Sequence, residues 1–349
     1  MRDHDRVRTK ASALAALLTA GLVLTACADD ADSDSDARTP AGSTTASAAP
    51  TASARPTPDA AQLATLGVNE LGAIPVFMYH QLVEKPRRIY DMSPAAFREQ
   101  LQTLYDAGYR PITAAALAAG EIDLPAGRHP VVLTFDDSTW DQARLLPDGT
   151  IDPKSAAGIL EAFEREHPDF RATATFFVNS TPEPFTDRRV LTWLAENGYE
   201  IAAHTWSHAD LGKLDDAGVQ AEIGRDVAWL EEAVPGLTVR TLAVPFGVHP
   251  RNRELLRAGT FEGVPYRLEA VFGVSEIASP SPYSLRFDLF DIPRLDTGLG
   301  VRDAQDALER LAADPTLRYT SDGDPERITF PADRADRLNP DFADRAQPY

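Results

Sequence analysis

Short apolar runs alternate with segments of helical periodicity along most of the chain. Buried strands are predicted at 74–79, 131–135, 174–178, 199–203, 241–244, 267–274 and 286–295. Helices are predicted at 93–108, about 154–166, 190–197, about 215–233, 251–257 and 304–312. Short apolar strands between amphipathic helices are typical of parallel βαβ units. The pattern therefore predicts an α/β fold, either a barrel or an open doubly wound sheet.

Both architectures carry their functional residues at the carboxyl ends of the strands, and three clusters fall there. Asp136 and Asp137 directly follow the strand at 131–135. Two adjacent carboxylates at such a position are costly unless they bind a metal ion or have strong hydrogen-bond partners. A turn or a helix cap is the ordinary alternative for an Asp pair.

The other two clusters follow later strands. His204 and His208 come directly after the strand at 199–203. Two imidazoles four residues apart can bind one ion if the segment turns helically, although a chance pair on a solvated loop is the alternative. The third cluster, Pro245-Phe246-Gly247, predicts only a turn when it is taken alone.

The amino-terminal segment has the pattern of an export signal. Four basic residues within positions 1–10 precede an apolar run at 11–24 that is too short to span a bilayer. The single cysteine, Cys27, excludes an internal disulfide and ends the sequence Leu-Thr-Ala-Cys, which resembles a bacterial lipobox. This resemblance implies a lipid anchor on Cys27. An ordinary cleaved signal with a chance cysteine is the alternative.

Four regions are expected along the 349 residues. A lipoprotein signal at 1–26 precedes a disordered Ala/Ser/Thr/Pro/Asp tether at 27–62, which lacks the apolar side chains for a core. A folded domain follows at 63–315, and a polar extension at 316–349 is expected to wrap the surface or fray. The expected location is outside the cytoplasm of a bacterium, anchored by lipid to the cell membrane.

Composition narrows the possible partners. Hydrophobic residues make up 43% of the chain, which is enough for a sizeable core. The formal net charge is −19, with 53 acidic and 34 basic residues. Nucleic-acid binding requires a basic surface, so no nucleic-acid partner is expected.

Taken together and in this order, the three clusters resemble a known family. Thr-Phe-Asp-Asp at 134–137, His-Thr-Trp-Ser-His at 204–208 and Pro-Phe-Gly at 245–247 resemble the motifs of the polysaccharide deacetylases. This family is also called the NodB homology domain, or carbohydrate esterase family four. The resemblance covers roughly residues 72–300 and implies an irregular (β/α) barrel with about seven parallel strands.

The resemblance also implies roles for the clusters. Asp137, His204 and His208 would bind one divalent metal ion, usually zinc, with positions left open for water and the acetyl carbonyl. Asp136 would be the general base. The turn at 245–247 would bind the substrate, and a backbone N–H there would stabilise the tetrahedral oxyanion. The products would be acetate and a free amine on the sugar.

The chain departs from the family pattern at several places. Ser138 stands where the family often has glycine, and Ala243 and Val244 stand where an arginine usually precedes the turn. No Leu-x-His motif lies near the carboxyl end, where many members keep the histidine that protonates the leaving amine.

Two residues are expected to replace the missing ones. Met-Tyr-His at 78–80 resembles the exopolysaccharide deacetylases whose histidine strand is permuted to the front of the domain, which implies that His80 is the general acid. A packed core histidine is the alternative. Arg294 is expected to orient Asp136, although a surface ion pair would explain an arginine equally well.

The sequence thus predicts a hydrolase that removes N-acetyl groups from a cell-surface polysaccharide containing N-acetylglucosamine, either peptidoglycan or exopolysaccharide. An O-acetyl esterase acting on acetylated glycan and a catalytically silent carbohydrate-binding lipoprotein are the alternatives. Some aromatic side chains could stack on sugar rings, but aromatic residues more often belong to the core. The candidates are Trp140, Trp206 and Phe246.

Overall fold

The computed structural model describes residues 58–181, 185 and 187–349. The predictions for the signal, for Cys27 and for most of the tether concern residues 1–57 and lie outside the described residues. Within the described part of the chain, no helix is long and apolar enough to cross a membrane.

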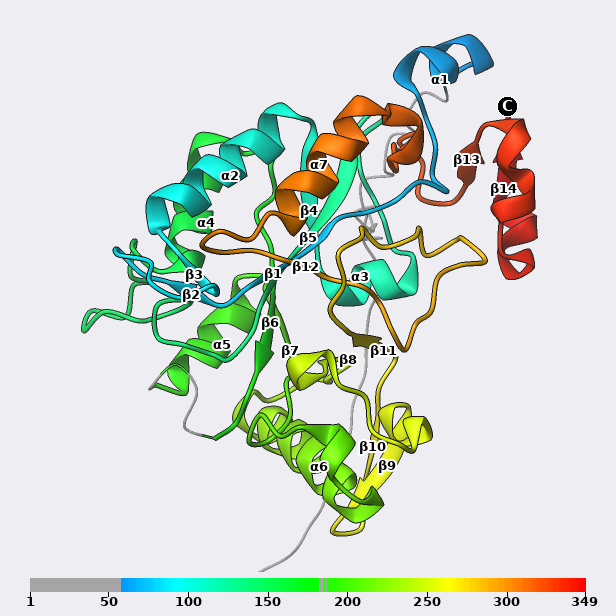
Figure 1. The fold of residues 1–349 in the computed structure, drawn as a ribbon. Coiled ribbons are helices and arrows are strands. Elements are labelled where there is room, and N and C mark those ends of the chain that lie inside the picture. Colours follow the sequence, from blue (N-terminus) through cyan, green and yellow to red (C-terminus); the bar gives the residue numbers. More distant parts are fainter. Residues whose placement is uncertain (1–57, 182–184, 186) are drawn as a thin grey trace, which may run out of the picture. The chain divides into compact units, whose positions relative to one another are not determined.

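A parallel sheet organises the domain (Figure 1). Its strands follow the order β11-β8-β7-β6-β5-β1-β12, and β4 also pairs with β5. Their bounds are β1 (Val76–Tyr79), β4 (Tyr109–Ile112), β5 (His129–Phe135), β6 (Thr175–Val178), β7 (Glu200–Ala203), β8 (Thr241–Ala243), β11 (Ala270–Phe272) and β12 (Leu295–Asp296). Every pair in this sheet is parallel, as βαβ units require.

The sheet curls back on itself. β1 lies along one edge of β5, while β4 and then β6 follow each other along the opposite edge. Two isolated parallel bridges, Phe272 to Ile292 and Ser275 to Leu295, connect β11 with the segment that enters β12. The prediction of an irregular (β/α) barrel with about seven parallel strands is therefore confirmed.

The longer helices cover the outer face of this sheet, whereas Ala114 and Leu117 of a short helix belong to the cluster on the inner face. The longer ones are α2 (Pro94–Asp106), α4 (Ala156–Glu166), α5 (Arg189–Glu196), α6 (Asp216–Ala233) and α7 (Asp303–Ala313), and two short ones are α1 (Ala60–Leu66) and α3 (Ala114–Ala119). Ser93 caps α2 by accepting a hydrogen bond from the Ala96 N–H at 3.1 Å, with Pro94 in the first turn, as predicted. The helix expected at 251–257 is instead a 3₁₀ turn at Arg253–Leu256. The Asn252 side chain caps this turn.

Alternate residues of each strand belong to two separate apolar clusters, because successive strand side chains point to opposite faces. Leu133 and Phe176 pack with the helices, whereas Val132 and Phe177 belong to the cluster on the inner face. Continuing this alternation along β5 places Asp136 on the same inner face as Val132. The orientation of Asp136 toward the inner face thus follows from the strand's period of two.

Several short elements escaped prediction or proved shorter than expected. The strand expected at 286–295 is reduced to β12, because Pro293 lacks a backbone donor and the Asp288 side chain forms a turn with the Phe290 N–H. The strand expected at 267–274 shrinks to β11. Three small pairs were not predicted: β2 (Gln81–Leu82) with β3 (Asp91–Met92), β9 (Ala258–Phe261) with β10 (Val264–Arg267), and β13 (Ile328–Phe330) with β14 (Ala346–Pro348).

The segment at 316–349 wraps around the domain and does not fray. Tyr319, Ile328 and Phe330 are fully buried and belong to the inner apolar cluster. The buried Glu70 carboxyl group accepts hydrogen bonds from the Thr329 N–H at 2.7 Å and from the Tyr319 hydroxyl at 3.2 Å. This polar segment therefore contributes to the core.

Candidate active site

Asp136 and Arg294 form a buried ion pair at the inner face of the sheet. The guanidinium donates from Nη1 to Oδ1 at 2.6 Å and from Nη2 to Oδ2 at 2.8 Å. Arg294 is 0% exposed and is itself held by the Gly273 carbonyl and the Thr134 hydroxyl. Burial opposes ionisation of Asp136, but the charge and hydrogen bonds of Arg294 outweigh it and hold the pKa of this carboxyl well below its usual range. Asp136 is therefore an ionised, rigidly oriented carboxylate.

Three further side chains lie beside this pair and could hold a metal ion. One ligand atom from each of Asp137, His204 and His208 can be chosen so that all three lie within 4.8 Å of one another. The Oδ1 atom of Asp137 is 3.6 Å from His204 Nε2 and 3.4 Å from His208 Nε2. A carboxylate and two imidazoles at this separation leave part of a coordination sphere open, as a catalytic zinc site does.

His204 is oriented by its surroundings. Its Nδ1 donates to the Ala243 carbonyl at 2.8 Å, which fixes the tautomer and leaves Nε2 as an acceptor. Nε2 is buried and has no hydrogen-bond partner among the residues that the structure describes. An orphaned acceptor of this kind is costly unless a ligand occupies it. The chemistry of this atom therefore fits a metal ion.

Two buried polar residues fix the backbone around His204. Asp226 accepts from the His204 N–H at 3.1 Å and from the Ser180 hydroxyl at 2.5 Å, and burial raises the pKa of Asp226 to about 7. The Asn179 amide donates to the carbonyls of His204 and Thr205. These contacts hold the histidine segment against the ends of β6 and β7.

Backbone strain is concentrated at this site. Eight described residues other than glycine have a positive φ, and five of them belong to the three motifs or directly follow one of their residues. The five are Asp137 (75°), Ser138 (53°), Thr205 (68°), His208 (57°) and Phe246 (59°). Such conformations cost about 1–3 kcal/mol each and cluster at ligand-binding sites. The left-handed backbone at Ser138 also explains why glycine suits this position. The Ser138 hydroxyl accepts a hydrogen bond from the Asn179 N–H at 3.0 Å.

A cavity of about 190 Å³ opens over these groups, and His80 lines it together with both aspartates and both histidines. His80 follows Tyr79, which pairs with Phe135, so the next residues in register are His80 and Asp136. Its Nδ1 is buried without a hydrogen-bond partner in the described structure. Burial lowers the pKa of His80, although the Asp136 and Asp137 carboxylates act in the opposite direction.

The Pro-Phe-Gly turn lies on the rim of the same cavity. Phe246 is 65% exposed, and its ring contacts the His208 ring edge-on at 4.6 Å between centroids. Gly247 has a φ of 66°, and a Cβ there would lie 3.2 Å from Val274, so glycine suits this position in two ways.

Comparison with known proteins agrees with this geometry. Residues 123–262 match the model of the polysaccharide deacetylase family. This chain contains a polysaccharide deacetylase domain. The matched residues include the expected base, Asp136, and the three expected metal ligands. His80 and Arg294 lie outside the match.

The deacetylase domain is also similar to individual relatives. It is 32% identical over 93 residues to a chitin deacetylase of Pestalotiopsis, covering 26% of each chain. It is 30% identical over 139 residues to a chitooligosaccharide deacetylase of Rhizobium leguminosarum, covering 40% of this chain and 53% of the relative. The chain thus spans about a quarter to a half of the length of these curated relatives.

The fold is shared with solved structures. A Streptococcus pyogenes deacetylase, solved in complex with acetate, aligns with a TM-score of 0.51 and 20% identity. This alignment covers 68% of the present chain and 97% of the streptococcal one. At this identity the likeness concerns the fold of the deacetylase domain.

Sequence reasoning missed several residues of the site. Asp296 lines the cavity, and burial together with the charge of Asp303 raises the pKa of Asp296 to about 6. Because Asp296 lies two positions after Arg294, the period of two along this strand could have placed both on one face. Asn179 and Asp226 carried no signal, since each lies in a segment without a recognised motif.

Proposed function

We propose that this protein is a metal-dependent hydrolase that removes N-acetyl groups from a cell-surface polysaccharide containing N-acetylglucosamine, either peptidoglycan or exopolysaccharide. The observation that carries the proposal is the buried, unpartnered Nε2 of His204, which lies between an ionised Asp136 and the Asp137–His208 pair. A base beside a three-ligand metal site is what metal-assisted hydrolysis of an amide requires.

Asp137, His204 and His208 would hold the metal ion, and zinc fits their mixture of one carboxylate and two imidazoles. Such an ion polarises a carbonyl and lowers the pKa of water. The protein's own residues fix the geometry: Ala243 orients the His204 ring, and Asn179 and Asp226 hold its backbone.

Asp136 is suited to accept a proton from the attacking water. It is ionised, and Arg294 occupies one lone pair on each oxygen and so leaves others available. The bidentate contact also prevents rotation of the carboxylate. Arg294 would therefore position the base.

His80, which lines the same cavity, would give a proton to the leaving amine. Its place in register with Asp136 supports this role, because an acid and a base must both reach the scissile bond. The turn at Pro245-Phe246-Gly247 would border the acetyl group, with a backbone N–H supporting the oxyanion.

An O-acetyl esterase would use the same groups, and a silent carbohydrate-binding protein would not need the base. The Arg294–Asp136 pair lies beside the three candidate metal ligands, and this combination of a base with a metal site favours an enzyme over a binder. We also propose that a lipid on Cys27 tethers the protein outside the cytoplasm. Replacing Cys27 by alanine should then release it from the membrane fraction.

Acetate release by the purified protein tests the proposal. The substrates are N-acetylglucosamine oligomers, peptidoglycan and acetylated xylan, each with added zinc or with a chelator. His208→Ala should abolish release, whereas His167→Ala, a histidine packed on Tyr105 away from the cavity, should retain it. Release of acetate from xylan alone would establish the esterase alternative. No release from any substrate would overturn the proposal that the protein is an enzyme.

A further inference from the structure

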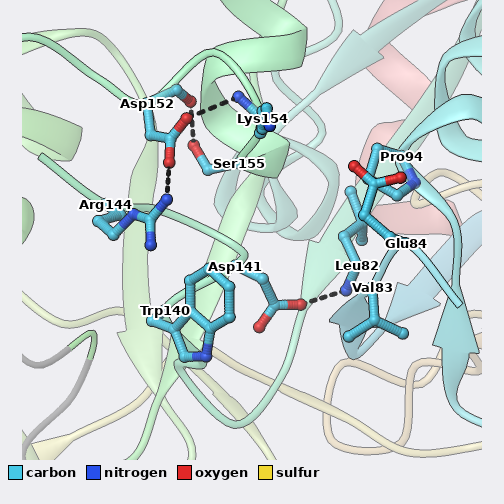
Figure 2. A pocket seen from close by; sticks show the side chains of 10 residues that line it. All are labelled: Leu82, Val83, Glu84, Pro94, Trp140, Asp141, Arg144, Asp152, Lys154 and Ser155. Carbon is cyan, nitrogen blue, oxygen red and sulfur yellow. Dashed lines mark hydrogen bonds and ion pairs between the residues drawn. The ribbon is translucent and has the colours of Figure 1, made fainter. Parts of the chain in front are cut away.

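A second cavity, of about 350 Å³, is lined in part by residues that closely follow His80 and Asp137 in the sequence (Figure 2). One wall contains Leu82, Val83 and Glu84, and the opposite wall contains Trp140 and Asp141. Leu82 lies two residues after His80, and Trp140 lies three residues after Asp137. At about 3.3 Å per residue, the two cavities are separated by no more than roughly 10 Å of chain on either wall.

The indole of Trp140 is held in place although it is 51% exposed. The guanidinium carbon of Arg144 lies over the ring, 4.6 Å from its centre. Arg144 is paired with Asp152, whose carboxylate also accepts from the Lys154 N–H at 2.9 Å. Figure 2 shows this chain of contacts along one side of the cavity. A large apolar surface that is both exposed and immobilised suits ligand binding, because little entropy remains to be lost.

The polar groups of the lining identify the class of ligand. Carboxylates (Glu84, Asp141) and cations (Arg144, Lys154) both face this space, and the Asp141 carboxylate accepts from the Leu82 N–H across it. A simple anion or cation would meet a like charge here. A hydroxyl both donates and accepts, so a ring with several hydroxyls can satisfy both kinds of group. The volume lies within the range of small-molecule sites.

We propose that this cavity is a glycan subsite, which binds a second pyranose ring of the polymer on Trp140 while an acetylated residue lies at the metal site. This inference rests on the proposed function for the identity of the polymer. It predicts that the protein prefers long substrates to short ones, and that Trp140 carries the preference.

The experiment measures kcat/KM on N-acetylglucosamine oligomers from the disaccharide to the hexasaccharide. The zinc-loaded wild type should show a rise at the length that first fills the cavity. Trp140→Ala should reduce that rise by about tenfold, the effect of about 1.4 kcal/mol of lost contact. Trp229→Ala is a matched control. Trp229 lies on helix α6, is also part-exposed, and has the guanidinium of Arg188 4.6 Å from its ring centre.

A binding measurement separates this inference from the proposed function. The tetrasaccharide is titrated calorimetrically into His208→Ala protein, with and without the Trp140→Ala change. Weaker binding of the tetrasaccharide by the double variant than by His208→Ala supports the subsite, even if the wild type releases no acetate and the proposed function fails. If the wild type is active but Trp140→Ala changes neither the length dependence of kcat/KM nor the affinity, the subsite alone is overturned. If neither binding nor turnover is detected, both the subsite and the proposed function are overturned.

Discussion

Replacing Arg294 by methionine should destabilise the metal-free protein by about 3–5 kcal/mol, because the Asp136 carboxylate would be left buried without its charged partner. The side chains of both residues are almost fully buried, at 1% and 3% exposure, so little water would reach the remaining charge. Methionine retains much of the arginine stem, so that the loss concerns the charge more than the packing.

The magnitude follows from opposing contributions. At an effective dielectric constant of about 20, two unit charges about 4 Å apart attract each other by about 4 kcal/mol. The contacts of 2.6 and 2.8 Å are closer, and they include two charge-assisted hydrogen bonds. Desolvation of each ion costs several kcal/mol, so the intact pair is nearly neutral for stability, whereas the broken pair retains one ion's desolvation cost.

Urea unfolding of chelator-treated protein provides the measurement, and Asp136→Asn and the double variant complete a thermodynamic cycle. The double variant should be less destabilised than the sum of the two single variants, by about 2–4 kcal/mol. Arg240→Met is the control, because Arg240 forms a 2.7 Å ion pair with Glu269 that is exposed and should contribute less than about 1 kcal/mol. A loss below 1 kcal/mol for Arg294→Met, or an additive cycle, would refute this reasoning.

Three further predictions concern other parts of the domain. Burial raises the pKa of Glu70 to about 8, from an ordinary value of 4.5, so between these pH values the folded state holds a proton that the unfolded state releases. The free energy of unfolding should therefore fall by a few kcal/mol as the pH rises from about 4.5 to 8. Glu70→Gln should flatten this pH dependence, as measured by urea unfolding. Asn179→Ala should weaken zinc binding about 10–100-fold in chelator competition, since it removes the hydrogen bonds to the carbonyls of His204 and Thr205. Gly158→Ala should lower the melting temperature despite the better helix propensity of alanine, because its Cβ would lie 2.0 Å from the Asp152 carbonyl oxygen; a rise in melting temperature would contradict that contact.

Long apolar runs made most of the barrel predictable, and polar strands did not. The run at 131–135 is fully apolar apart from Thr134, and it became β5. By contrast, β4 contains Arg110 and Pro111 and has the composition of a loop. It is buried because the Arg110 guanidinium reaches Asp169 and two nearby carbonyls. Such a strand depends on partners that are distant in sequence, and no local pattern reports them.

The site shows the same division between local and distant information. Asp136, Asp137, His204 and His208 lie in short motifs whose residue types indicate their chemistry. Asp226 lies in the middle of helix α6, on the buried side, and only the folded structure shows that it reaches the backbone of the histidine motif. Motifs therefore reveal the groups that would touch the substrate, whereas the residues that orient them emerge from packing.

The order of strands along the chain explains how His80 can lie opposite Asp136 although the two are far apart in sequence. β1 comes first among the strands of the sheet and β12 comes last, yet they are neighbours: Phe77 pairs with Leu133 on one side and with Leu295 on the other. This register brings His80, Asp136 and Arg294 from three adjacent strands to one cavity. Lateral pairing, and not chain order, thus determines which side chains meet. Our proposal that His80 replaces the histidine of the absent Leu-x-His motif therefore requires its strand to lie between β5 and β12, as β1 does.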